Sequence, residues 1–178
     1  KDPTRVGPVN MILKPDLLLE RANSRPETRI DSPTKSPWVF GDVQESLTPA
    51  SNVEILWPNA KYSLVWDIEK EKYLIYFADQ PNFASSGEQL YADSAIIQLV
   101  SITPSIYGDK FGGVTPLSKT IGSGKAILLR DGVSFQLTWK REAESDSTTW
   151  VTADGKDAHF KPGRIWVFLT DQEPKITP

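Results

Sequence analysis

The chain has 178 residues, a formal net charge of −3 and a pI near 5.2, which suits one domain or one domain with an appendage. Its 39% hydrophobic content, with six Trp, five Tyr and seven Phe, predicts a packed core and excludes wholesale disorder. The chain has no cysteine for disulfides or thiol chemistry. It also lacks an apolar run of the roughly 18 residues that a membrane span needs and a basic stripe, so we expect no nucleic-acid partner.

The first 37 residues are predicted to form a linker with one short strand and one helix. Val9–Leu13 has the apolar content of a short strand. Pro15 suits the first turn of a helix and Asp16 suits the positive end of its dipole, so we predict a helix over 15–23 that packs on the core. Ser24–Pro37, rich in Ser, Thr and Pro, is predicted to be a surface loop. The expected division is a linker over 1–37, a β domain over 38–170 and a polar tail over 171–178.

A β-hairpin over 121–140 is the strongest pattern in the chain. Ala126–Leu129 is an apolar run of strand length, and Arg130-Asp131-Gly132 is typical of a turn, because glycine accepts a positive φ at little cost. The next eight residues alternate, with Val133, Phe135, Leu137 and Trp139 between Ser134, Gln136, Thr138 and Lys140. This period of two predicts a strand with one buried face.

Similar strands, separated by Gly, Pro and Asp, recur through the β domain. We predict them over Val53–Trp57, Lys61–Asp67, Lys72–Phe77, Gln89–Tyr91, Ala95–Ile102, Thr148–Thr152, Asp157–Phe160 and Ile165–Leu169. Pro104–Ile121, which is rich in glycine, is predicted to be a long loop with at most a short strand near Leu117. The fold class expected is therefore mainly β: an antiparallel meander that forms a barrel or a sandwich, flanked by one short N-terminal helix.

An ordered set of short motifs resembles the C-terminal domain of the YerB-like bacterial lipoproteins, a family of unknown function. The motifs are Gly124-Lys125-Ala126, Arg130-Asp131-Gly132, Thr138-Trp139-Lys140, Thr152-Ala153-Asp154-Gly155-Lys156 and Pro162-Gly163 followed by Trp166. The resemblance implies an extracytoplasmic domain of a membrane-anchored lipoprotein, with its own N-terminal domain as a partner and with the lipid anchor outside this chain. No signal peptide is expected at Lys1, which fits a processed or truncated piece of an exported protein.

The residues themselves indicate no catalytic set, metal site or cofactor. The segment from Gly122 to Lys125 imitates a phosphate-binding loop, but Ala126 replaces the required Ser or Thr and a strand follows instead of a helix. His159 is the only histidine, and it lacks metal-ligand spacing and a nucleophile elbow. We therefore expect no catalytic residue, no metal and no cofactor.

Five residues are weak candidates for ligand or partner binding. Trp38, Trp57 and Trp150 lie at strand ends or near turns, where aromatic rings can stack on a ligand; the alternative is packing under loops. Arg130 and Asp131 lie at the tip of the hairpin, where they can meet a partner's charges or simply form a turn.

The function expected is that of a binding or interaction domain without catalysis, acting on an envelope protein or polymer. The alternative is a hydrolase or transferase that acts on a cell-envelope polymer, with Asp93 or Asp109 as its acid.

Overall fold

A computed structural model describes residues 3–4, 6, 12–28, 36–42 and 48–178. The chain forms two compact units, Lys1–Ser36 and Pro37–Pro178. The described part of the first unit contains α1 (Pro15–Asn23), with Pro at its start, Asp16 in its first turn and Arg21 in its last. The predicted helix is therefore confirmed, and its packing on the core stays a prediction. Of the predicted strand Val9–Leu13, residues 9–11 lie outside the described residues, and residues 12 and 13 form no strand.

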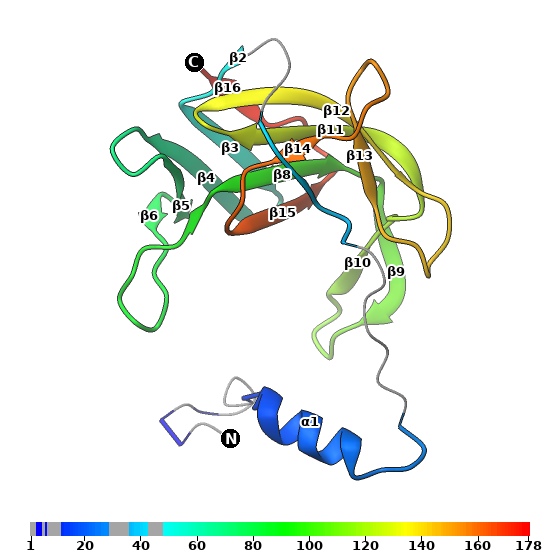
Figure 1. Cartoon of the computed structure of the whole chain (residues 1–178). Helices are drawn as coiled ribbons and strands as arrows, with labels where there is room; N and C mark the ends of the chain where they lie inside the picture. The colour runs from blue at the N-terminus through cyan, green and yellow to red at the C-terminus, as the bar shows by residue number, and fades with distance from the viewer. Residues whose placement is uncertain (1–2, 5, 7–11, 29–35, 43–47) are drawn as a thin grey trace. The chain divides into compact units, whose positions relative to one another are not determined.

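Two six-stranded sheets build the second unit (Figure 1). The first sheet contains β16 (Lys175–Thr177), β3 (Asn52–Trp57), β4 (Ala60–Asp67), β5 (Lys72–Phe77) and β6 (Gln80–Pro81), with β7 (Tyr91–Ala92) also paired to β5. The second sheet contains β13 (Thr149–Val151), β12 (Val133–Arg141), β11 (Gly122–Arg130), β8 (Ser94–Leu99) and β15 (Ile165–Thr170), with β2 (Thr48–Pro49) also paired to β12. The mainly β prediction is confirmed in its sandwich form. Within the described residues, no helix is long and apolar enough to span a membrane.

The second sheet is buried on both faces. Its inner face forms the first core with the first sheet, where Val53, Ile55, Leu64 and Ile75 join Ile97, Ile127 and Leu129. Its outer face forms the second core, which contains Ile96, Leu128, Phe135, Leu137, Trp139, Trp150 and Phe160. A short parallel pair, β1 (Val39–Phe40) and β14 (His159–Phe160), contributes Phe160 to this second core. Because β8 lies between the two cores, Ile96 and Ile97 are both fully buried on opposite faces.

The central hairpin is confirmed in register and in turn. Strands β11 and β12 pair from Gly122↔Arg141 to Arg130↔Val133. Asp131 and Gly132, the two residues between them, both have positive φ, of 53° and 74°, as a type I′ turn requires. The alternation in β12 is confirmed from Phe135 to Lys140, with Phe135, Leu137 and Trp139 buried in the second core rather than between the sheets. It is wrong at the start of the strand, where Ser134 is buried and Val133 is only partly buried.

Two sequence predictions are wrong in detail. The loop Pro104–Ile121 is a two-stranded ribbon of β9 (Ile102–Gly108) and β10 (Val114–Ser118), and the predicted strand Ala95–Ile102 ends at Leu99. The Asp109 carboxylate accepts N–H bonds from Phe111 and Gly113, which closes the tip of the ribbon. Because this segment is rich in glycine and proline, its sequence pattern indicated a loop rather than strands.

Several strand pairings also differ from those of an antiparallel meander. Strand β15 runs parallel to β8, and β1 runs parallel to β14. The predicted tail 171–178 contributes β16, which pairs with β3. Each of these pairings joins distant segments, which local patterns do not report.

Candidate functional site

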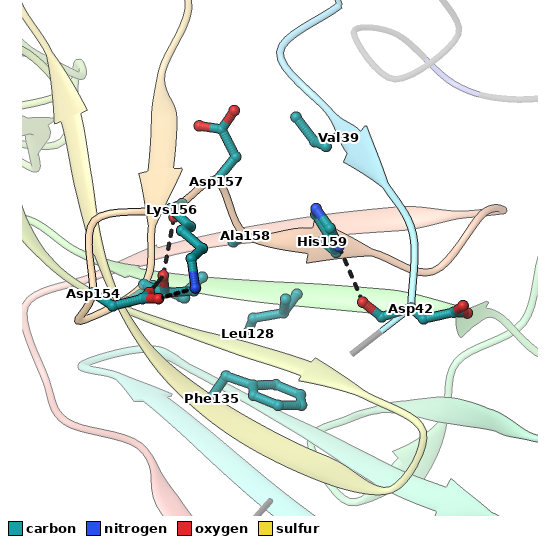
Figure 2. A pocket seen from close by; sticks show the side chains of 11 residues that line it. Val39, Asp42, Leu128, Phe135, Asp154, Lys156, Asp157, Ala158 and His159 are labelled. Carbon is teal, nitrogen blue, oxygen red and sulfur yellow. Dashed lines mark hydrogen bonds and ion pairs between the residues drawn. The ribbon is translucent and has the colours of Figure 1, made fainter. Parts of the chain in front are cut away.

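A pocket of about 310 Å³ opens on the outer face of the second sheet. Its floor comes from β11 and β12, one wall comes from the turn after β13, and the other comes from the β1–β14 pair (Figure 2). The lining residues are Val39, Asp42, Leu128, Phe135, Leu137, Thr152, Asp154, Lys156, Asp157, Ala158 and His159. All belong to the second unit.

The floor is apolar because the second core lies directly beneath the pocket. Leu128, Phe135 and Leu137 line it, and all three are almost fully buried. Phe135 and Leu137 project from the same face of β12, and Leu128 pairs with Phe135 across the hairpin. A ligand that enters the pocket therefore meets hydrocarbon at its base and polar groups only at its rim.

The first wall is a tight turn fixed by side-chain bonds. The Lys156 ammonium and the Thr152 hydroxyl both contact the Asp154 carboxylate, and the Thr152 N–H donates to the Lys156 carbonyl over 2.8 Å. Hydrogen bonds from Lys156 and Thr152 hold the pKa of the Asp154 carboxyl well below its usual range. Asp154 is therefore a fixed negative charge at neutral pH.

The second wall orients the only histidine. Nδ1 of His159 lies 3.0 Å from the carbonyl oxygen of Asp42 (Figure 2). Because a carbonyl can only accept, this contact assigns the proton to Nδ1 and leaves Nε2 as an acceptor in the neutral ring. Gly41 makes room for the ring, since a Cβ there would lie 2.9 Å from Nδ1.

We expect Gly41→Ala to displace the His159 ring and to reshape this wall, because a Cβ at 2.9 Å must move either the ring or the backbone. His159 is the only histidine, so its imidazole gives a single set of NMR ring signals, which should shift. Gly87→Ala is the control for a substitution away from the ring: nothing lies within 4 Å of the added carbon, although the φ of 86° at Gly87 adds backbone strain that Gly41 does not have. Ring signals that respond equally to both substitutions would contradict this role of Gly41.

Arg130, a predicted binding residue, instead supports the second wall from behind. It is 6% exposed, and its Nη1 donates to the carbonyls of Gly41 and His159 over 2.7 and 2.9 Å. Its Nε donates to Asp131 over 2.7 Å, and Lys161 pairs with the same carboxylate at 2.8 Å. Partial burial alone would raise the pKa of the Asp131 carboxyl, but the bonds from Lys161 and Arg130 outweigh it and lower the pKa.

The three predicted tryptophans lie in two places. Trp38 stacks on Trp150, with ring centroids 4.7 Å apart and planes at 11°, and both rings meet Phe160 edge-on. Trp57 donates its indole N–H to the Leu169 carbonyl over 2.9 Å and borders a separate groove beside the β9–β10 ribbon. The structure therefore does not bring the five predicted binding residues into one site.

Sequence reasoning missed most of the pocket. The sequence indicates the Asp154-Gly155-Lys156 segment only as a turn, not as a part of a binding site. No sequence pattern singles out Asp42 or Asp157. Asp93 and Asp109, the acids of the enzymatic alternative, do not line the pocket; their carboxylates accept backbone N–H bonds from Arg164 and from Phe111 and Gly113. Within the described residues, no group of three His, Asp or Glu side chains is arranged to hold a metal ion.

The fold and the motif set define a mainly β domain of the YerB-like type. Residues 52–167 match the family model described as "Protein of unknown function (DUF3048) C-terminal domain", and the chain belongs to this family. The crystal structure of the YerB protein from Bacillus subtilis is similar, with a TM-score of 0.76 and 19% identity; the match covers 100% of this chain and 59% of the YerB chain. No curated protein matches. The predicted resemblance is confirmed, and at this identity the YerB structure supports the fold alone.

Proposed function

We propose that this domain is a non-catalytic binding module of a bacterial envelope lipoprotein, and that it binds its ligand in the pocket beside His159. The observation that carries the proposal is the pocket itself: an apolar floor under a rim of fixed polar groups. Ligand sites in proteins commonly have this composition, in which apolar walls supply affinity and a few polar groups set the orientation.

The chemistry of the rim favours recognition over proton transfer. A general acid or base works best when its pKa is near the working pH, whereas the bonds from Lys156 and Thr152 lower the pKa of Asp154. The His159 ring is tied through Nδ1 to a backbone carbonyl. These groups are suited to holding a ligand in one orientation.

The proposed location and partners rest on the lipoprotein resemblance. The chain spans 59% of the YerB chain, which leaves room in a YerB-like protein for the N-terminal partner domain that we propose. We place the full-length protein outside the cytoplasm, held by a lipid anchor beyond this chain, where it meets an envelope protein or polymer. Fractionation of cells tests the location, and recovery of the full-length protein only from the cytosol would contradict it.

NMR screening of the whole chain with a library of small polar fragments tests the binding site. We expect the fragments that bind to shift amide signals of the pocket residues, chiefly the 152–159 segment and β12. Fragments that bind only elsewhere, or none that bind at all, would overturn the site. Incubation with purified peptidoglycan tests the enzymatic alternative, because release of soluble fragments would show catalysis and reject a binding-only role.

A further inference from the structure

We propose that the pocket binds an ammonium group carried on a short apolar stem. This inference rests on the proposed function, because it names the ligand class of the same pocket. The charge of the rim, the chemistry of the floor and the volume of the cavity support it.

The rim carries an excess of negative charge. Among the described residues that line the pocket, three are acidic, Asp42, Asp154 and Asp157, and one, Lys156, carries an ammonium group. That ammonium pairs with Asp154, so these two charges compensate each other. Among the described residues, the carboxylates of Asp42 and Asp157 make no ion pair or hydrogen bond. The pocket therefore attracts a cation and repels an anion.

The floor suits the stem of such a ligand. Leu128, Phe135 and Leu137 offer only hydrocarbon, so methylene groups that lie against them leave water without forfeiting a hydrogen bond. Long amines in proteins bind in this way, with the stem on apolar surface and the charged end at the polar edge. When the His159 ring is neutral and donates from Nδ1, its Nε2 adds a hydrogen-bond acceptor to the second wall.

The volume limits what can enter. A cavity of about 310 Å³ is at the lower end of ligand pockets, which run from about 300 to 1,000 Å³. It accommodates one amine of side-chain size. Such a group could come from a free small amine or from a lysine side chain of a partner segment, and these two sources share the chemistry proposed here.

Calorimetry and NMR on the whole chain test the ligand class with matched probes. Pentylamine represents a free amine, N-acetyl-lysine methylamide represents a lysine in a peptide, and glutarate is an anion of similar length. We expect both amines to bind with shifts at the pocket amides, to bind more weakly at high salt, and glutarate not to bind. Tighter binding of the lysine derivative would identify a protein segment as the source, and tighter binding of pentylamine would identify a free amine.

Charge-neutral variants complete the test. Asp157→Asn should weaken amine binding about two- to fivefold, the effect of losing one partly exposed charge, and Asp42→Asn with Asp157→Asn should weaken it further. Glu69→Gln, which removes the same charge from the β4–β5 turn, should leave the affinity unchanged. Equal effects of Asp157→Asn and Glu69→Gln, in variants with native near-UV circular dichroism, would overturn the inference.

The outcomes separate this inference from the proposed function. If glutarate or neutral fragments shift the pocket signals while neither amine does, the pocket is a binding site and the ligand class is wrong. If no probe or fragment shifts those signals, the proposed function is wrong as well.

Discussion

Replacement of Arg130 by methionine is expected to lower the free energy of unfolding by at least about 1.5–3 kcal/mol, the usual contribution of one hydrogen bond that involves a charged group. The Arg130 side chain is 7% exposed, and its guanidinium donates to the carbonyls of Gly41 and His159 and to the Asp131 carboxylate. Methionine fills a similar volume but satisfies none of these acceptors. Urea unfolding followed by tryptophan fluorescence measures the change.

Arg164→Met is the matched control. Its side chain is 47% exposed and contacts Glu88 at 3.4 Å, so its loss should cost less than about 1 kcal/mol. Arg130→Met should also broaden the NMR signals of the pocket, because Arg130 holds the backbone of Gly41 and His159 in place. A destabilisation no larger than that of Arg164→Met would show that the buried guanidinium does not hold the β1–β14 pair.

Local patterns in the sequence predicted most of the strands. The β11–β12 hairpin is an example: the Asp131-Gly132 turn and the alternation in β12 depend on neighbours within a few residues. The helix over 15–23 is equally local, because Pro15 and Asp16 define its start. Such elements need no knowledge of the rest of the chain.

The role of Arg130 could not be predicted in this way. Beside a turn, an arginine suggests a solvated charge or a ligand-binding group. Its two carbonyl partners are 89 and 29 residues away in the sequence, and burial follows only when the β1–β14 pair covers the hairpin. The pocket has the same origin, because its floor, its turn and its histidine come from separate segments that tertiary contacts bring together.

The motifs that carry the family resemblance mainly build the fold. Trp139 donates to the Leu99 carbonyl over 2.8 Å, and Gly124 permits this contact, since a Cβ there would lie 2.7 Å from the indole nitrogen. A Cβ on Gly163 would overlap the carboxylate of Asp93. The Thr152–Lys156 turn differs, because its side chains line the pocket. We infer that most of these motifs stabilise the fold, and that this turn both stabilises the fold and lines the proposed binding pocket.

Trp150→Ala is expected to lower the free energy of unfolding by about 3–5 kcal/mol, as truncations of large buried aromatic residues do. The Trp150 ring is 6% exposed, stacks on Trp38 and meets Phe160 edge-on. Removing it opens a cavity at the end of the second core, where backbone pairing is short: β13 spans only Thr149–Val151 and cannot compensate. Thermal and urea unfolding measure the loss.

Trp150→Phe separates the stacking from the indole N–H. Within the described residues, that buried N–H has no hydrogen-bond partner, so replacing it loses no bond, and a phenyl ring keeps much of the contact. The expected cost is less than about 1.5 kcal/mol. A double-mutant cycle with Trp38→Leu and Trp150→Leu should give a coupling of about 0.5–1.5 kcal/mol, the usual contribution of an aromatic pair. Additive effects would mean that the two rings stabilise the domain independently and that their stacking does not hold this edge of the second core closed.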